Sequence, residues 1–272
     1  MVPKPALILC LILWLSCKKN KDATVPLPLL AKIESTLNGE TVTITTQFSA
    51  GKIVLMEVAG TSAGKPVYVL TKLIRNSEGI IQKIVIKNPV YLTTFSTDSI
   101  VYTVIYSGAE KRYTSMVNHL FYKTGATEVD STFFSYDDAG KVKQAIKLAN
   151  EMGGQGFKEV ERNEFTYNRD NLIRCKNYQL NSLFLEQTVE YDNSVNPLAF
   201  NKEWILIGST RNNRRFEQSS FNNATTLTYN YNQNGSTSTT TMTYTYNASN
   251  LPASRIDNLP NGSIQTVTYH YQ

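Results

Sequence analysis

The C-terminal part of the chain repeats a short alternation of apolar and polar positions. Residues 227–231, 242–246 and 267–271 all read aliphatic-Thr-Tyr-any-Tyr. Alternate side chains of an extended strand point to opposite faces, so the aliphatic residue and both tyrosines share one face. Thr, Asn and His occupy the other face. The pattern predicts three half-buried strands, antiparallel and close together.

A second unit places Asp or Asn directly after a Tyr, and Gly or Asn four residues after that Tyr. The acidic or amide side chain can bond backbone N–H groups just ahead, and Gly or Asn can adopt the left-handed conformation that closes a short loop. The unit therefore predicts strand–turn–strand, with its Asp residues, including Asp137, Asp138 and Asp192, as turn formers. Copies begin at Tyr136, Tyr167, Tyr191 (with Val195 at the Gly position), Tyr231 and Tyr246, and 75–79 is a degenerate copy without the Tyr.

Further strands are predicted by alternation between turn signals such as Asn38-Gly39. They cover 41–45, 52–58, 67–74, 80–86, 99–106, 111–122 and, after the turn at 137–140, 142–152. The predicted fold class is all-β. An antiparallel meander of hairpins forms a large twisted sheet that curls to a barrel or half-barrel, with a two-sheet sandwich as the alternative. From Gln218 onward only Arg255 and Asp257 are charged, so these strands must be paired or curled so that few edges remain open.

One segment interrupts the alternation. Trp204 to Ile207 is the most apolar run after the N-terminal region, and it follows Asn196-Pro197. We expect a short helix that caps an open end of the sheet, with a fully buried strand as the alternative. Apolar runs of this kind usually belong to the core. The functional alternative is a binding patch for an apolar ligand.

The N-terminal residues have the pattern of an export signal. Lys4 precedes an apolar stretch from Ala6 to Leu15 that is too short to span a bilayer. It ends in Ser16-Cys17, which resembles the lipobox of bacterial lipoproteins. The predicted organisation is therefore a signal peptide over 1–16, a lipidated Cys17 with a tether over 17–31, and one β domain over 32–272. An ordinary cleaved signal with an incidental Cys is the alternative.

Composition and motifs offer little chemistry. The net charge of +5 is spread along the chain, which gives no reason to expect nucleic acid. His119 and His270 lack partners at metal-ligand spacing, and no phosphate loop or nucleophile elbow occurs. Cys175 is expected to be a buried small hydrophobe. Glu159, Glu161 and Glu164 alternate with basic residues and are interpreted as a solvated face. No catalytic residue, metal site or cofactor is predicted.

The Tyr-Asp/Asn turns loosely resemble the YD-repeat hairpins of bacterial surface and toxin proteins. With the lipobox and Asn196-Pro197, the region 127–272 more closely resembles Bacteroidetes-type outer-membrane lipoproteins of unknown function. The resemblance implies a lipid-anchored outer-membrane protein with the membrane as partner. The basic tether after Cys17 favours the periplasmic face.

Two functions of different class follow. The first is a non-catalytic envelope lipoprotein that binds another protein or a glycan. Its candidate surface comprises Tyr229, Tyr231, Tyr244, Tyr246, Tyr269, Tyr271 and Trp204. The second is a carbohydrate-active hydrolase with an unrecognised carboxylate pair, or else a carrier of an apolar ligand lined by Trp204, Ile205 and Ile207. Because the tyrosines recur at strand ends before turns, packing on the sheet explains them more simply than ligand contact.

Overall fold

The computed structural model describes residues 29–87, 97–125, 127–150, 156–198, 203, 206 and 220–272. Strands make up the regular structure of these residues, and no helix long and apolar enough to cross a membrane is found among them. The strands are β1 Leu30–Leu37, β2 Glu40–Ser49, β3 Lys52–Ser62, β4 Lys65–Arg75, β5 Ile81–Lys87, β6 Thr97–Ser107, β7 Arg112–Tyr122, β8 Thr127–Tyr136, β9 Val142–Asn150, β10 Phe157–Asn168, β11 Asn171–Gln179, β12 Ser182–Val195, β13 Asn222–Tyr231, β14 Ser236–Tyr246, β15 Pro252–Asn258 and β16 Ile264–Tyr271.

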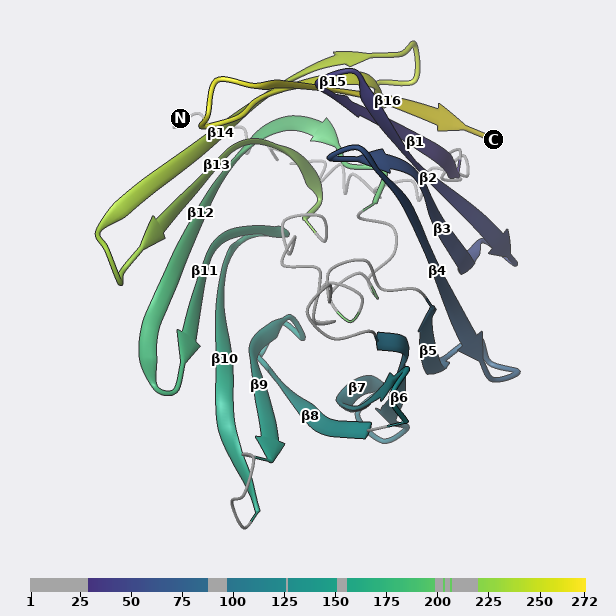
Figure 1. The fold of residues 1–272 in the computed structure, drawn as a ribbon, viewed down its shortest axis with the longest axis vertical. Coiled ribbons are helices and arrows are strands. Elements are labelled where there is room, and N and C mark those ends of the chain that lie inside the picture. The colour runs from purple at the N-terminus through teal and green to yellow at the C-terminus, as the bar shows by residue number, and fades with distance from the viewer. Residues whose placement is uncertain are drawn as a thin grey trace, which may run out of the picture.

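Each strand pairs antiparallel with the next in sequence, and the ring closes where β1 pairs with β16 (Figure 1). The closing register runs from Leu30 opposite Tyr271 to Leu37 opposite Gln265. The predicted antiparallel meander is confirmed. The sheet closes fully into a barrel, so the sandwich alternative is wrong. The low-charge C-terminal strands have no open edge, as expected.

Leu30 and Ala31 already belong to β1, so the fold begins inside the predicted tether.

The barrel interior is filled mainly by apolar side chains. Ile84, Ile100, Met116 and Leu120, from three neighbouring strands, are almost completely buried. They belong to a core that continues around the inner wall to Cys175 on β11. A second cluster on β12–β14 contains Val189, Ala224, Leu227 and Met242, with Tyr191, Tyr229 and Tyr244 packed against it.

The predicted turn chemistry is confirmed at three hairpins. At the β8–β9 turn, Asp137 Oδ1 accepts the backbone N–H of Lys141 at 2.8 Å, and Gly140 has a φ of 77°. Asn247 Oδ1 accepts the N–H of Leu251 at 3.0 Å in the same way. The degenerate copy at Asn76 has this geometry too, because its Oδ1 accepts the N–H of Ile80 at 2.9 Å.

Two copies of the unit differ from the prediction. The β10–β11 turn uses Arg169, whose φ is 51°, and Asn171 lies in β11, where its side chain bonds Asn222. Asp192 accepts the backbone N–H of Ser194 at 2.9 Å, as the unit predicts, but no hairpin turn follows, because β12 continues through it to Val195. Val195 is β-branched and disfavours the left-handed conformation that the turn needs, so the strand extends instead.

A buried ion pair connects the wall to the segment between β12 and β13. Arg75, at the end of β4, donates to both carboxylate oxygens of Glu203, at 2.9 and 2.7 Å. Tyr113 donates to the same carboxylate at 2.7 Å. Leu206, which bonds Glu203 through its backbone, lies fully buried in the core. The helix expected over 204–207 otherwise falls outside the described residues.

Glycine substitution tests the turn geometry at Gly140. Gly140→Ala should lower the free energy of unfolding by about 1 kcal/mol, because an L side chain at a φ of 77° is strained. Gly108→Ala is the matched control, since Gly108 lies in open space without a positive φ and should be neutral or slightly stabilising. Urea denaturation measures both changes. Equal effects of the two substitutions would contradict the turn assignment.

The Arg75–Glu203 pair gives a larger expected effect. Glu203→Ala leaves a guanidinium that is only 8% exposed without its carboxylate, so stability should fall by about 3 kcal/mol. Glu110→Ala removes a carboxylate from an exposed pair with Arg112, and should cost less than about 1 kcal/mol. Thermal and urea denaturation compare the two variants. A Glu203→Ala loss as small as that of the control would show that the pair is dispensable.

Candidate inner-wall binding site

The three aliphatic-Thr-Tyr-any-Tyr phrases are β13, β14 and β16, and each turns its aliphatic residue and tyrosines to the interior. Leu227, Met242 and Val267 are buried, whereas the intervening Thr243 and Thr268 are exposed. The shared face predicted from the alternation is therefore confirmed. β13 and β14 are neighbours, and β15 separates β14 from β16.

Several inward tyrosines perform a structural task. Each donates its phenolic hydrogen to a backbone carbonyl of the preceding strand, near the open end of the hairpin that the two strands form. Such a bond satisfies a carbonyl and holds the strand ends together. The bonds run from Tyr136 to Tyr113 O, Tyr191 to Leu172 O, Tyr244 to Ala224 O at 3.0 Å, and Tyr271 to Pro252 O at 2.8 Å.

Tyr246 also has a structural partner, because its hydroxyl donates to the Asp192 carboxylate on β12. Tyr269 lies on the same inner face of β16, between the buried Val267 and Tyr271. Of the six predicted surface tyrosines, Tyr244, Tyr246 and Tyr271 therefore form bonds within the barrel wall.

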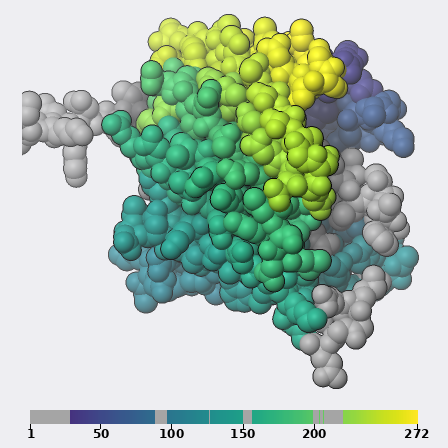
Figure 2. All heavy atoms as spheres, turned by 90° about the vertical axis from the view of Figure 1, so that its left-hand side faces the viewer, coloured from purple at the N-terminus to yellow at the C-terminus, as the bar shows by residue number. Residues whose placement is uncertain are grey.

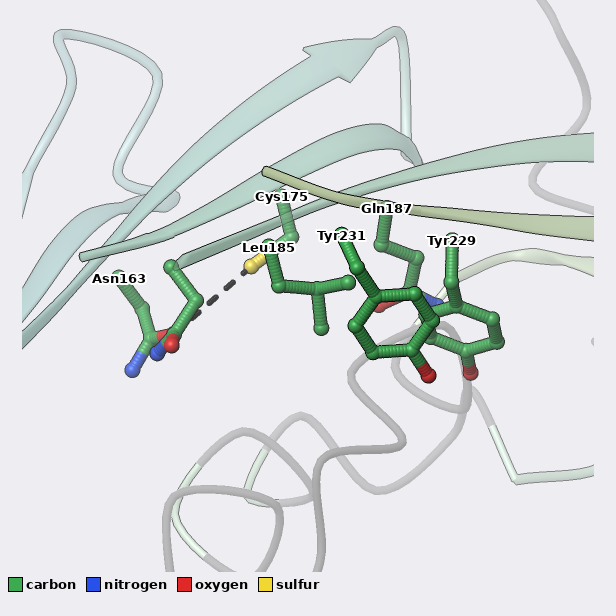
Figure 3. A pocket seen from close by; sticks show the side chains of 7 residues that line it. Asn163, Cys175, Leu185, Gln187, Tyr229 and Tyr231 are labelled. Atoms are coloured by element: carbon green, nitrogen blue, oxygen red, sulfur yellow. Dashed lines mark hydrogen bonds between the residues drawn. The ribbon is translucent and has the colours of Figure 1, made fainter. Parts of the chain in front are cut away.

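Tyr229 and Tyr231 lie differently. Both line a cavity of about 160 Å³ on the inner wall, where their rings lie near each other beneath β13 (Figure 3). The other lining side chains come from β10, β11 and β12, and are Asn163, Cys175, Asn177, Leu185 and Gln187. The cavity thus combines two phenol rings, one aliphatic side chain and three amides. Among the described residues that line the cavity, none is charged.

The amides on one side of the cavity form a fixed network. Asn177 donates from Nδ2 to Glu161 Oε1 and to Asn163 Oδ1, both at 2.8 Å. Asn163 Nδ2 donates to the same Glu161 oxygen at 3.2 Å. Glu161 is therefore hydrogen-bonded to inner-wall amides, so the predicted solvated face is wrong for this residue. The β-strand alternation turns it to the opposite face from Arg162 and Glu164, which pair with each other at 3.2 Å.

This network leaves one polar atom open. Asn177 is only 3% exposed, and within the described residues its carbonyl oxygen Oδ1 has no hydrogen-bond partner. Because both Nδ2 hydrogens are already donated, the amide orientation is fixed and Oδ1 is left as an acceptor. A buried acceptor without a partner costs roughly 1–3 kcal/mol. Asn118 Oδ1 on β7 is in the same state within the described residues.

Sequence reasoning missed the polar half of this site. Asn163, Asn177 and Gln187 are ordinary inward positions of three consecutive strands, and no motif marks them. The available signal was their alternation with charged residues. Each amide follows a charged residue, Arg162, Lys176 or Glu186, so when the charged side chain points outward the neutral amide points inward. Register was needed to bring the three together.

Other candidate residues lie outside the cavity or outside the described residues. Cys17, Trp204, Ile205 and Ile207 belong to the undescribed part of the chain. His119 stacks on Phe121, and His270 bonds Glu34 at 2.8 Å. Within the described ranges, no group of three or more His, Cys, Asp or Glu residues could hold a metal ion.

Cys175 has the environment predicted for it. It is not in a disulfide, is 4% exposed, and belongs to the main core cluster. Its Sγ lies 4.0 Å from Asn163 Oδ1 at the edge of the cavity.

Comparison with known proteins finds similarity in structure alone. No family model and no curated protein matches the sequence. A porin-like protein from Bacteroides uniformis shares this fold. Its solved structure aligns with a TM-score of 0.55 at 16% identity, and the match covers 89% of this chain and 98% of that one. A porin-like protein from Bacteroides vulgatus aligns over 90% of this chain with a TM-score of 0.42 and 11% identity.

The buried tyrosines predict a loss of stability at alkaline pH. Burial raises the pKa of Tyr136 to about 12, and burial together with the bond to Asp192 raises the pKa of Tyr246 to about 12. In the unfolded chain a tyrosine ionises near pH 10, so the unfolded state loses its protons first as pH rises. The stabilisation is complete below about pH 10 and disappears between about pH 10 and 12.

Tyr136→Phe should therefore lower the free energy of unfolding at neutral pH, because the bond to Tyr113 O is lost. It should also make that free energy fall less steeply between about pH 10 and 12. Urea denaturation followed by circular dichroism at several pH values measures both effects. Parallel curves for the variant and the original protein would contradict a role for this hydroxyl.

Proposed function

We propose that the protein is a non-catalytic, lipid-anchored envelope protein whose barrel stands in water and binds a partner molecule. The observation that supports it best is the distribution of polarity across the wall. A barrel inserted in a membrane presents an apolar band outward and a polar lumen inward. Here the larger core cluster in the interior is apolar, beside the inward pairs Lys147–Asp130 and Arg255–Asp257, and outward positions such as Glu164, Lys176 and Glu186 are charged.

The charged outward positions lie in the middle of long strands. Glu164 and Lys176 are register partners on β10 and β11, and Lys176 is opposite Glu186 on β12, with a charge separation of 3.9 Å. Figure 2 shows this side of the barrel as a continuous wall. An outward charge at the bilayer centre costs about 2–4 kcal/mol for Lys or Arg, so this wall favours an aqueous surrounding.

Outward positions on other strands agree. The outer face of β14 carries Thr237, Thr239, Thr241, Thr243 and Thr245 at alternate positions, and all are exposed. On the closing strands, Glu34 bonds both Lys32 and His270. These groups can bond water, whereas a hydrocarbon surrounding would leave them unsatisfied.

Exposed large apolar side chains lie on several strands: Tyr68 and Ile74 on β4, Ile105 on β6, Phe121 on β7, Phe133 on β8, Phe157 on β10, Ile173 on β11, Ile256 on β15 and Ile264 on β16. Ile105 and Phe133 are both opposite Ser115 of β7 in the register and form a small patch. Charged and Thr positions such as Glu164, Lys176 and Thr243 interrupt the others. Patches of this kind on water-soluble domains commonly mark contact surfaces, which agrees with a binding role.

The first described residues and the cavity lie toward opposite ends of the barrel. β1 begins at Leu30 beside Tyr271, so both termini are at one end. Tyr231 and Leu185 lie near the turns at 232–235 and 180–181, which belong to the other end. A lipid on Cys17 would hold the first end at the outer membrane, with the periplasmic face favoured by the basic tether, and leave the cavity end directed away from the bilayer.

Removing the acylated cysteine tests this proposal. Cys17→Ala should abolish palmitate labelling and release the folded barrel into the aqueous fraction without detergent. Cys175→Ala is the matched control, because its thiol is buried in β11 and should not affect labelling. Cell fractionation and metabolic labelling give the readouts.

Two results would overturn the proposal. Retained labelling in Cys17→Ala would exclude the lipid anchor at this residue. A Cys17→Ala barrel that stays in the membrane after alkaline washing would show that strands, and not lipid, hold it there.

A further inference from the structure

We propose that the outer wall over β6–β9 is the surface through which two copies of this chain bind each other. The inference rests on the proposed function, because the lipid anchor fixes how two copies face each other, and it identifies the partner molecule of that function as a second copy. Three observations support it: the side chains of the wall, the place where the chain enters the barrel, and the size of the wall.

The outward positions of these four strands hold no acidic side chain, Lys or Arg over most of their length. Such residues are absent from the outward positions between Ser99 and Ile105 on β6, Ser115 and Phe121 on β7, Thr127 and Phe133 on β8, and Gln144 and Leu148 on β9. Aliphatic and aromatic side chains recur among these positions on all four strands. The wall is therefore a largely apolar patch.

Charged side chains border this patch on both sides. Lys83 is exposed on β5, and Glu159 and Glu164 pair with Arg162 on β10. One row of the register crosses the patch from Lys83 through Thr103, Val117, Ser131 and Leu148 to Glu159. The apolar surface is therefore bounded and does not continue as a band around the barrel.

The most exposed apolar side chains lie close together in the patch. Ile105 and Phe133 are each 47% exposed, and they flank Ser115, the register partner of both. Phe121 is 38% exposed on the same face of β7, and the half-buried Val117 lies between it and Ser115. Contiguous apolar surface is unfavourable in water, at about 25 cal/mol per Å², and commonly marks a contact surface.

A membrane is a poor occupant for the patch, because the chain enters the barrel on the other side. β1 lies across the barrel from β8 and β9 (Figure 1). Sixteen strands about 4.8 Å apart and tilted by about 40° form a barrel about 32 Å wide. Residues 18–29 extend to at most about 40 Å, so they would have to cross the barrel end almost fully extended for the patch to lie on the bilayer. Ordering the tether in that way is costly in entropy.

The same anchor makes a second copy a suitable occupant. Two barrels held by the end that carries both termini share one membrane normal, so a two-fold axis along it brings the same wall of each together. Their strands then cross at about 80°, close to the orthogonal class of sheet packing. Residues near the axis meet their own copies, and a charge there would meet a like charge. Ser115, Val117 and Ser131 are neutral, so the patch is compatible with itself.

The size of the patch predicts a weak contact. Four strands about 4.8 Å apart, with up to four outward rows about 6.7 Å apart, cover roughly 500 Å² on each copy. Standard interfaces bury about 800 Å² per partner, and weaker associations bury less. We expect a dissociation constant between about 10 μM and 1 mM in solution. Two copies anchored in one membrane are held near each other, which raises their effective concentration and favours the pair.

Cross-linking in membranes tests which wall meets a second copy. Ser131→Cys, in the lipidated chain that also carries Cys175→Ala, puts a thiol beside the two-fold axis. A short bismaleimide should join two copies through it, and electrophoresis measures the dimer. Ser254→Cys in the same background is the matched control, since Ser254 is an outward, half-buried serine on β15, away from the patch. Ser131→Cys should give several-fold more dimer than this control.

A charge on the patch should separate the copies. Ile105→Glu places two carboxylates in one apolar contact, so association of the full chain carrying Cys17→Ala should weaken at least about tenfold. Sedimentation equilibrium at up to about 1 mM protein measures the association. Ile256→Glu is the matched control: Ile256 is 45% exposed on β15, against 47% for Ile105, and its substitution should leave association unchanged. In the Ser131→Cys chain, Ile105→Glu should abolish the membrane cross-link and Ile256→Glu should retain it.

The second-copy contact is wrong if Ser131→Cys and Ser254→Cys cross-link equally, or if both Glu substitutions have the same effect. It is also wrong if Ser131→Cys cross-links to a different protein instead of to itself. Binding of the Cys17→Ala barrel to phosphatidylcholine vesicles, lost in Ile105→Glu, would assign the patch to a membrane. If circular dichroism shows that Ile105→Glu does not fold, Phe133→Ser decides, with Ile256→Ser as its control.

The outcomes separate this contact from the proposed function. A barrel that needs its lipid to stay in the membrane, but shows no cross-link specific to Ser131→Cys, overturns the contact alone. A barrel that stays in the membrane without its lipid overturns the proposed function instead.

Discussion

The pairing of β1 with β16 is the contact on which the rest of the structure depends. It joins residues more than two hundred positions apart, with Glu34 opposite Thr268 and Ser35 opposite Val267. Closure removes the exposed edges that a low-charge, Thr-rich sheet would otherwise present to other chains. It also creates an interior, so every inward side chain must be packed or hydrogen-bonded within one enclosed space.

The tyrosines show how this interior is organised. At four hairpins an inward Tyr donates to a carbonyl of the preceding strand, which fastens the end of the hairpin opposite its turn. The turn residues fasten the other end through Asp or Asn side chains. The wall can therefore be regular while one part of it, at Tyr229 and Tyr231, contributes to a cavity instead. Tyrosines that look identical in sequence thus differ in their surroundings, and Tyr229 both packs against the cluster on β12–β14 and lines the cavity.

The side chains of the barrel wall, and not its fold, determine what surrounds the barrel. The similarity to a porin-like protein concerns the path of the chain, and at 16% identity it specifies no side chains. The side chains decide which solvent a barrel faces. Our proposal that water surrounds this barrel rests on the outward Glu164, Lys176 and Glu186 and on the apolar core cluster inside.

Local sequence determined the elements of this protein. Alternation in the aliphatic-Thr-Tyr-any-Tyr phrases specified which residues share a face, and Asp137, Asn247 and Asn76 specified tight turns, because these effects act within a few residues. Tertiary structure decided everything that depends on register and closure. It extended β12 through Asp192 and turned Glu161 inward. It also paired Arg75 with Glu203, and brought Asn177 to the same cavity as Tyr229 and Tyr231. Strands several positions apart meet only when the sheet curves, and no short-range pattern encodes that curvature.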